Sequence, residues 1–389
     1  MAETLIAKKK VLLSKIEAVY GQDPVPTAGA NGIVVRSIEL SPMELETQEN
    51  ETVKPNFGND EEIPVLANVK LTIEVDITGS GVAGTVPPLA HYLRACCMAE
   101  TILATAVTGT ATAGSINGIT LAAGASATDG TYVGLTINID SGAGIGQKAV
   151  IKSYNGTTKA AVFTTPLNVA VDNTSVYTIP KQVIYRRITD NYESMTSYVY
   201  FGNKVQHKIT GARGTVSFMF PYKKTPTAKF TFTGCYNPVV DAPAPSITMS
   251  GRKKPVAVNA KNTKAIKLHG YSGVIMADLS IDLGNEIVFR SLPGGADEVL
   301  ITNSKPSGSI TQQATTVADK DWWTAIGNVD VGAFSFIHGL EVGNTIKVDA
   351  CRAQLTKPSY GESDGVVTLQ TGLKLLPDLG NDELILTFL

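Results

Sequence analysis

The ten residues from Val69 to Thr78, VKLTIEVDIT, decide the fold. Apolar side chains at the odd positions alternate strictly with Lys70, Thr72, Glu74 and Asp76 at even positions. Successive side chains of a β-strand point to opposite faces of its sheet. One face of this strand is therefore expected to be buried and the other wetted, as in an antiparallel sheet that has water on one side.

Two segments flank this strand. Downstream, Pro87 to Leu103 (PPLAHYLRACCMAETIL) predicts a helix, because prolines open it and apolar residues recur near helical spacing. Upstream, Met43 to Glu62 is a long acidic stretch, and long loops inside compact domains usually have a function. We interpret it as an arm for contacts between subunits or between rings; a solvated surface loop is the alternative. Its charged residues are Glu44, Glu46, Glu49, Glu51, Lys54, Asp60, Glu61 and Glu62.

The N-terminal segment predicts a short helix over Glu3 to Tyr20, where Leu5, Leu12, Ile16 and Val19 lie near helical spacing. Its longest apolar run after the lysines is too short for the core of a secretory signal. No other stretch approaches the roughly 20 apolar residues that span a bilayer. We therefore expect neither export nor a stable membrane association.

The composition favours a strand-rich chain. Of 389 residues, 36 are glycine, 7% are aromatic and 17% are charged, whereas an average domain is about 25% charged. The 43% hydrophobic content excludes a disordered chain. Few charges indicate that neighbouring subunits cover part of the surface. The net charge of −2 argues against a protein that coats nucleic acid.

The composition changes after the predicted helix. Between Thr101 and Gln147 the charged residues are Asp129 and Asp140 alone. Short alternating runs between glycine turns predict a compact β module inserted into the surrounding domain. We divide the chain into the N-terminal part of a first domain (1–107), the inserted module (108–180), the C-terminal part of the first domain (181–245) and a second domain (246–389), with the proline-rich stretch from Asp241 to Pro255 as a linker.

The second half of the chain repeats the order of segments in the first half. RSIELSPMEL, the acidic stretch, VKLTIEVDI, PPLAHYLRACC and YVYFGNKVQHKI correspond to MADLSIDLGNEI, a middle containing Leu292-Pro293-Gly294-Gly295, SGSITQQA, DKDWWTAIG and FSFIHGLEVGNTIKV. A preserved order with little identity indicates two copies of one domain. The inserted module has no counterpart in the second half.

Gly79 to Gly84 reads G-x-G-x-x-G between a predicted strand and a predicted helix, the spacing of a dinucleotide-binding fingerprint. Three observations argue against a cofactor. The preceding strand alternates with charged residues, whereas the first strand of a doubly wound sheet is nearly all apolar. Two prolines separate the glycines from the helix. The acid at the expected distance, Glu100, lies within the predicted helix. We expect no cofactor.

No other motif predicts catalysis or metal binding. The four cysteines form no C-x-x-C pair, the four histidines form no H-x-x-x-H pair, and there is no G-x-S-x-G. We therefore expect a chain that is not an enzyme and holds no metal. Trp322 and Trp323 lie together on a predicted short helix. We interpret them as an anchor of that helix to a sheet, with stacking on a sugar or base as the alternative.

Several segments together resemble the tail tube proteins (major tail proteins) of long-tailed bacteriophages of the siphophage type. They are KIEAVYGQDPVPTAGANGIVVRSIEL, VKLTIEVDITGSGVAGTVPPLAHYLRACCMAET, ITGARGTVSF and GNDELILTF. The inserted module is similar to the small β domains that decorate phage structural proteins. The resemblance implies a ring-forming, β-sandwich-like tube domain. Together with the internal repeat, we therefore expect a mainly β fold with two tandem tail-tube-like β-sandwich or barrel domains, each with a packed helix, plus the inserted domain, which departs from the single tube domain of ordinary members.

The resemblance also implies a function and partners. Copies of the chain would form stacked rings around a channel for viral DNA in the virion tail, after assembly in the host cytoplasm. The tape measure, tail terminator and distal tail proteins are the implied partners. In such a ring, Lys70, Thr72, Glu74 and Asp76 are expected to face the lumen.

The duplication bears on the number of chains in a ring. If each domain contributes about four strands and six domains close the ring, about 24 strands surround the channel, more than the 16 to 18 strands that leave an aqueous pore in porins. We therefore favour three chains with pseudo-sixfold symmetry, with six chains as the alternative. A carbohydrate-binding or adhesive β protein, which would use the tryptophan pair and the inserted module, is the rival function.

Overall fold

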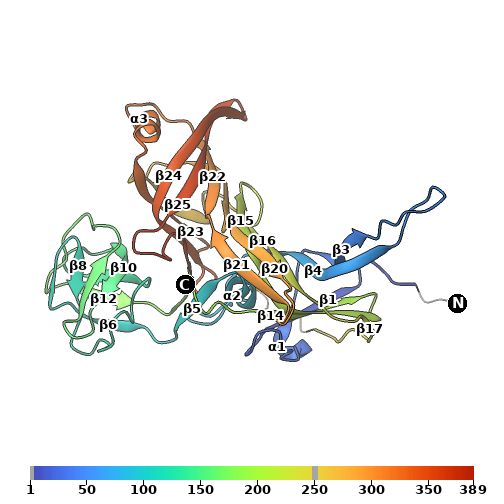
Figure 1. Cartoon of the computed structure of the whole chain (residues 1–389). Helices are drawn as coiled ribbons and strands as arrows, with labels where there is room; N and C mark the ends of the chain where they lie inside the picture. Colours follow the sequence, from blue (N-terminus) through green and yellow to red (C-terminus); the bar gives the residue numbers. More distant parts are fainter. Residues whose placement is uncertain (1–3, 248–252) are drawn as a thin grey trace.

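The computed structural model describes residues 4–247 and 253–389 (Figure 1). The chain is mainly β, with large antiparallel sheets. In the described residues the helices are short: α1 (Ala28–Asn31), α2 (Ala90–Ala95) and α3 (Trp322–Gly327). The strands form a sheet of 17 strands, a separate sheet of seven strands and a two-stranded hairpin.

The strands fall into three groups along the chain. In the first half of the body they are β1 (Lys10–Ile16), β2 (Gly32–Ile33), β3 (Ser37–Glu49), β4 (Glu62–Asp76), β5 (Met98–Leu103), β13 (Gln182–Arg187), β14 (Met195–Phe201), β15 (Val205–Pro221), β16 (Thr227–Tyr236) and β17 (Val240–Asp241). In the module they are β6 (Val107–Thr110), β7 (Ala113–Gly114), β8 (Gly118–Thr120), β9 (Thr136–Ser141), β10 (Lys148–Tyr154), β11 (Ala160–Phe163) and β12 (Val176–Ile179). In the second half they are β18 (Thr263–Leu268), β19 (Met276–Asp282), β20 (Asn285–Arg290), β21 (Glu298–Ser304), β22 (Ser307–Gln313), β23 (Val331–His338), β24 (Ile346–Ser363), β25 (Val366–Leu376) and β26 (Ile385–Phe388).

One order of strand pairing occurs twice in the large sheet. In the first half β3 pairs with β4, β4 with β16, β16 with β15, β15 with β14 and β14 with β1. In the second half β19, β22, β25, β24, β23 and β18 pair in the same order. Helix α2 follows β4, and helix α3 follows β22. The segments that correspond are those that the sequence comparison aligned.

The two halves join edge to edge. Residues Ser217–Pro221 of β15 pair with β19, and Ser217 lies opposite Asp282. The apolar faces of both halves contribute to one continuous core, in which Phe220 and Phe336 lie with ring centroids 4.9 Å apart. The two repeated units therefore share one sheet and one core. Of the predicted linker from Asp241 to Pro255, residues 248–252 lie outside the described residues.

The module lies at one side of the body (Figure 1). The chain enters it through β6 and leaves it through β12; these strands pair with Val107 opposite Ile179, and β12 also pairs with β9 inside the seven-stranded sheet. The module has a core of its own that includes Ile137, Phe163 and Tyr177. The entry and exit strands therefore belong to the module's own sheet, and the chain of the body continues before β6 and after β12.

The predicted helix over Glu3 to Tyr20 is wrong for residues 4–20, and Glu3 lies outside the described residues. Residues Lys10–Ile16 form β1, which pairs with β14 along its whole length. Leu12 and Leu13 are both buried, on opposite faces of the strand. Burial on both faces suits a strand inside a sheet, and the long-range pairing with β14 overrides the local helical spacing.

The predicted helix over Pro87 to Leu103 is too long. It ends after one and a half turns at Cys96, because Cys97 adopts a φ of 69°, in the left-handed region that ends helices. The chain then turns into β5, which pairs with β13. The apolar residues beyond Cys97 therefore belong to a strand. The short helix predicted around Trp322 and Trp323 is confirmed as α3.

Candidate assembly surface: a polar sheet face, two open edges and an arm

Strand β4 carries the polar face that the sequence predicts. Lys70 is exposed and Thr72 and Glu74 are partly exposed, whereas Leu71 and Ile73 on the opposite face are fully buried under α2 and its neighbours. Asp76 lies at the end of this row and is only 8% exposed, because its carboxylate accepts a 2.5 Å hydrogen bond from Nε of Arg36. Its charge is thus neutralised locally, while Lys70 and Glu74 remain accessible.

The polar face continues across both halves of the sheet. One cross-strand row runs from β3 to β24 through side chains that share a face, because directly paired residues point to the same side. In order they are Ser37, Glu74, Lys229, Ser217, Asp282, Ser307, Lys374 and Gln354.

Serine and threonine dominate this face, and its charges balance. Between β4 and β25 four basic residues, of which Arg213 is buried, stand against four carboxylates: Lys70, Arg213, Lys229, Lys374, Glu74, Asp76, Asp278 and Asp282. A duplex binds in proportion to the phosphates that lysine or arginine neutralises. A surface of hydroxyl groups and balanced charge can border a nucleic acid without holding it.

Among the described residues, β3 and the distal part of β24 are two long strand segments of the sheet that are each paired on one side only. Strand β3 pairs with β4 along one side, and no pairing is present on its other side. Strand β24 pairs with β23 only up to Gln354, so residues 355–363 pair with β25 alone. Exposed strand edges are templates for pairing with another chain. No signal in the sequence identified the distal part of β24 as an edge.

The acidic stretch is a β-hairpin and not an open loop. We call residues 43–68 the hairpin arm; it comprises the distal parts of β3 and β4 and the connection 50–61, and it projects from the body in Figure 1. Glu44 and Lys70 form a 2.5 Å ion pair at its base, and the hydroxyl of Thr47 donates to Glu62. Lys54 and Asp60 form an ion pair across the connection. Glu46, Glu49, Glu51 and Glu61 are exposed.

The hairpin arm also exposes apolar side chains that the sequence analysis did not single out. Val53 and Phe57 in the connection are fully exposed. Met43, Leu45, Ile63 and Val65 on the two strands are also exposed. The sequence signal that could have identified them is the occurrence of isolated apolar residues inside an acidic stretch. An arm with this composition is suited to a contact with another chain.

The glycines of the G-x-G-x-x-G sequence pack the two halves together. The amide of Gly79 donates to the side-chain oxygen of Asn344 at 2.8 Å, and the amide of Gly81 donates to the carbonyl of Gly343 at 2.8 Å. A Cβ at Gly79 would lie 2.0 Å from that same Gly343 carbonyl oxygen, so only glycine fits there. These amides already have partners within the chain.

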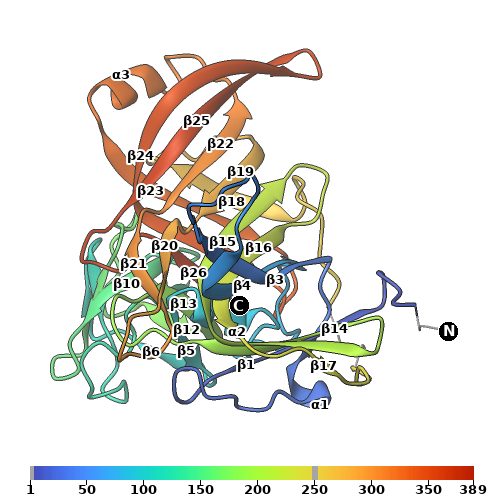
Figure 2. The same cartoon turned by 45° about the vertical axis from the view of Figure 1, so that its right-hand side comes forward.

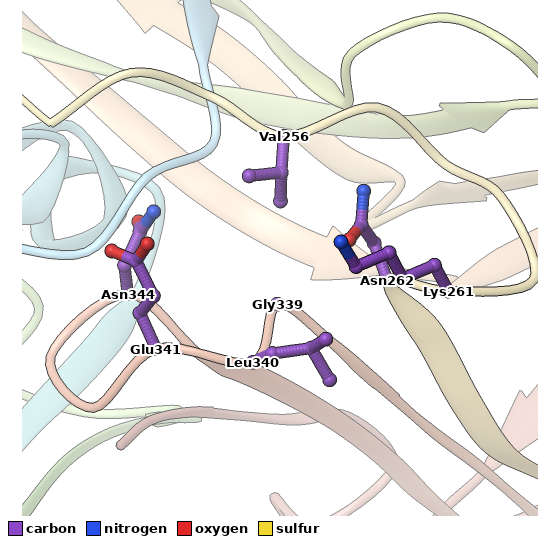
Figure 3. Close-up of a pocket in the computed structure, with 7 residues that line it drawn as sticks. All are labelled: Val256, Lys261, Asn262, Gly339, Leu340, Glu341 and Asn344. Atoms are coloured by element: carbon purple, nitrogen blue, oxygen red, sulfur yellow. The ribbon is translucent and has the colours of Figure 1, made fainter.

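A depression in the surface lies beside this contact, and it too is formed by residues that hold chain segments together. It measures about 330 Å³ and is lined by residues that include Lys261, Asn262, Glu341 and Asn344 (Figure 3). The amides of Asn262 and Asn344 donate to the backbone carbonyls of Ala257 and Lys254. Their hydrogen bonds hold loops, so the depression offers little for ligand chemistry.

The thiols and imidazoles are buried or partly buried, and they lie on several different elements. Burial raises the pKa of Cys97 to about 11, so this thiol is protonated near neutral pH. Burial lowers the pKa of His338, whose ring nitrogens contact the hydroxyl of Thr263 and the carbonyl of Val256. Within residues 4–247 and 253–389 no group of three or more acidic, histidine or cysteine side chains is placed to hold a metal ion. The same residues contain no helix with the length and apolarity to cross a bilayer.

The two tryptophans have different environments. Trp322 is 2% exposed and its indole N–H donates to Thr315 at 2.9 Å, so it anchors α3. Trp323 is 40% exposed and lies against Tyr360 with ring centroids 5.4 Å apart. The pair therefore does not form a joint platform for stacking on a sugar.

Comparisons with protein-family models and with curated proteins found no match.

Proposed function

We propose that the chain is the tail tube subunit of a long-tailed bacteriophage, a structural protein that closes into rings and stacks into a tube for the passage of DNA. The sequence resemblance suggests this class of assembly. The observation that carries the proposal is the joint between β15 and β19. Each chain also contains the two halves of a second such joint, the outer edges of distal β24 and of β3, and both are open.

The pairing of β15 with β19 inside the chain, the internal joint, predicts the register of the proposed joint between β24 of one copy and β3 of the next. Ser217 of β15 lies opposite Lys229, which lies opposite Glu74, two residues before the end of β4. In the second half Ser359 of β24 lies opposite Gln370 and then Thr311, which is also two residues before the end of its strand, β22. Ser359 therefore occupies the position of Ser217.

The other side of the joint follows by the same reasoning. Asp282 of β19 lies opposite Ser307, six residues before the end of β22, and Ser41 of β3 lies opposite Lys70, six residues before the end of β4. Since Ser217 pairs with Asp282 inside the chain, we expect Ser359 of one copy to pair with Ser41 of the next. Antiparallel pairing would then continue the sheet from chain to chain.

The number of strands that each chain supplies predicts the number of chains in the ring. Each chain supplies eight strands, β3, β4, β16, β15, β19, β22, β25 and β24. Three chains would supply about 24 strands, enough for a wide aqueous channel. The chain already contains two units, so we favour a trimeric ring with pseudo-sixfold symmetry over a hexameric one.

The polar sheet face would line the channel. Its hydroxyl groups and balanced lysines and carboxylates suit a conduit that must not hold its cargo. The opposite face packs against α2 and α3 and would face outward. The tape measure, tail terminator and distal tail proteins remain expected partners on the strength of the resemblance.

A cysteine pair tests the joint directly. Protein with Ser41→Cys is mixed with protein with Ser359→Cys under mild oxidation, and a disulfide-linked dimer is the expected product. Antiparallel partners have Cα atoms about 4.5–5.5 Å apart, within the range of a disulfide. Electron micrographs down the axis of the assembly should then show three peripheral module densities in each ring.

The matched control replaces Ser359→Cys with Tyr360→Cys, because neighbouring side chains of a strand point to opposite faces. The control pair should not cross-link. A protein that stays monomeric at high concentration, or rings whose Ser41→Cys and Ser359→Cys chains never cross-link, would contradict the proposed joint.

A further inference from the structure

We propose that the N-terminal segment of one copy, residues 4–9, docks on the tip of hairpin β24–β25, residues 364–367, of the neighbouring copy and pairs with the backbone of that tip. The inference rests on the proposed function, because it needs the neighbouring copy to be in place. It adds a contact whose residues belong to neither of the two open edges. The second half of the chain already makes the equivalent contact on the first half.

The template is the contact between Val258, shortly before β18, and the tip of hairpin β15–β16, residues 222–226. The carbonyl of Val258 accepts a 3.0 Å hydrogen bond from the amide of Lys223, and its amide donates to the carbonyl of Lys224 at 2.8 Å. Val258 forms a parallel bridge with Tyr222 and is 2% exposed. The segment before β18 thus covers the tip of the first-half hairpin.

A repeated hydrogen bond identifies the segment before β1 as the counterpart of the segment before β18. The amide of Gly339 donates to the carbonyl of Asn262, the residue before β18, at 2.8 Å. The amide of Gly202 donates to the carbonyl of Lys9, the residue before β1, at the same distance. The two glycines directly follow β23 and β14, the strands that pair with β18 and β1. Lys9 therefore occupies the position of Asn262.

The turn that leads into each strand is also repeated. In each segment the amide of the last residue before the strand donates to the carbonyl three residues back, which belongs to Asn259 in one segment and to Ile6 in the other. One residue further back lie Val258 in the second half and Leu5 in the first half. Leu5 therefore occupies the position of Val258.

Leu5 lacks the partners that Val258 has. Its side chain is 47% exposed. No residue in the described part of the chain hydrogen-bonds to its amide or its carbonyl. The chain end to which it belongs points away from the body in both views (Figures 1 and 2). The N-terminal segment thus has the shape of the template segment without a tip to cover.

The tip of β24–β25 is the counterpart of the tip of β15–β16. The amide of Ile77, one residue after β4, donates to the carbonyl of Pro226 at 3.1 Å. The amide of Ala314, one residue after β22, donates to the carbonyl of Val367 at 3.0 Å. Val367 therefore takes the position of Pro226, in agreement with the register of the proposed joint.

The second tip is uncovered. Pro226 is buried on the first tip, whereas Val367 is 54% exposed on the second. Both views show the tip of β24–β25 free at the far end of the second half (Figures 1 and 2). Gly365 takes the position of Lys223, and both residues have a φ in the left-handed region, 78° and 62°. We therefore expect the Gly365 amide of one copy to donate to the Leu5 carbonyl of the next, as strands are added to exposed backbone.

The two segments are complementary in chemistry. The N-terminal segment presents apolar side chains followed by lysines, and the tip presents apolar side chains beside a carboxylate. They are Leu5, Ile6, Lys8 and Lys9 on one copy and Val366, Val367 and Asp364 on the other. An apolar centre with opposite charges at its rim is the usual composition of a protein–protein contact. The occupant is a second copy of this chain, the copy whose β3 adjoins β24.

Cross-linking of mixed single variants in the full chain tests the contact. Protein with Leu5→Cys is mixed with protein with Asp364→Cys and treated with a short bismaleimide, and cross-linked dimers are expected. The matched control replaces Asp364→Cys with Tyr222→Cys, the same position on the first tip, where Val258 of the same chain already lies. The control should give no more dimer than the unsubstituted protein, and equal cross-linking at both positions overturns the inference.

The two cross-linking experiments separate this inference from the proposed function. If the Ser41→Cys and Ser359→Cys pair cross-links but the Leu5→Cys and Asp364→Cys pair does not, the ring joint stands and the N-terminal contact is wrong. If only the Leu5→Cys and Asp364→Cys pair cross-links, the N-terminal contact stands and the register of the ring joint is wrong. If neither pair cross-links, both fail.

A substitution in the N-terminal segment provides a second measurement. Leu5→Asp should raise the protein concentration needed for assembly by at least about tenfold, because the contact would otherwise bury a leucine side chain. The control is Val162→Asp in β11 of the module, where the side chain is similarly exposed at 43%, and it should leave this concentration unchanged. Circular dichroism should show both variants folded, since neither side chain is buried in the single chain. Assembly of Leu5→Asp at the same concentration as its control contradicts the contact.

Discussion

Arg213 connects the sheet of the first half to hairpin β20–β21. It lies between two tyrosine rings and donates to the backbone of β21, and it is 8% exposed. When a buried carbonyl loses its hydrogen-bond donor, the free-energy cost of removing the carbonyl from water is no longer offset by a hydrogen bond. The packing of β20–β21 on the first half therefore depends on one guanidinium.

We expect Arg213→Met to lower the free energy of unfolding by about 2–4 kcal/mol, because it removes a charged hydrogen bond and two cation–π contacts together. The measurement is chemical denaturation followed by circular dichroism. The control is Arg290→Met, an exposed arginine at the tip of β20, which should change stability by less than about 0.5 kcal/mol. Equal effects of both substitutions would refute the assignment.

At the scale of elements, the module is separable because the chain enters and leaves it through two strands, β6 and β12, that pair with each other. Val107 and Ile179 lie opposite each other, so a two-residue Asn-Gly turn can replace residues 108–178 without moving the flanking strands. The described module contacts that would be lost include packing on Ile184, the hydrogen bonds of Gln182 to Thr136 and an exposed ion pair between Lys152 and Asp378.

We expect the shortened chain to fold and to form rings of the same diameter without peripheral densities. The loss of the contacts on Ile184 and Gln182 should lower the stability of the body by about 1–3 kcal/mol. Thermal unfolding and electron microscopy measure the two outcomes. An aggregated or unfolded product would mean that the module supports the body.

The sequence predicts those elements whose residues carry a local signal. The strict alternation of Val69 to Thr78 specifies a half-buried strand, and the proline-opened segment specifies the position of α2. The same reasoning fails at Lys10–Ile16, because the partner strand Met195–Phe201 lies far away in the chain and decides the conformation. It also fails at Cys97, whose left-handed backbone is set by the pairing of β5.

The residues of the candidate assembly surface likewise fall into those that the sequence predicts and those that it does not. Lys70, Thr72 and Glu74 could be placed on a polar face from alternation alone, and the acidic hairpin arm from its length and charge. The open edge at residues 355–363 could not be found, because an edge is defined by which strand is absent beside it. Asp76 belongs to the predicted row, but its pairing with Arg36 depends on a contact that no local pattern encodes.

At the scale of the whole molecule, the balance of charge on the polar sheet face has a measurable consequence. We expect Glu74→Lys tubes to retain duplex DNA in co-sedimentation at low salt and to release it as salt rises, because each added cation contributes to salt-dependent binding. Unsubstituted tubes should retain little. The control is Asp140→Lys in the module, which changes the net charge equally but away from the sheet.

Retention of DNA by both variants would mean that net charge alone governs binding. Retention by neither would place the polar sheet face somewhere other than the channel wall. The proposal requires the Glu74→Lys variant to differ from its control.

The covalent fusion of two units has a kinetic implication for the proposed tube. In a circle of three chains, three of the six edge contacts exist before any chains meet. Each encounter between separate molecules costs at least about 4 kcal/mol of translational and rotational freedom. In the proposed tube, halving the number of encounters would lower the barrier to nucleating the first closed turn, so carrying two units in one chain would allow polymerisation to start at a lower protein concentration.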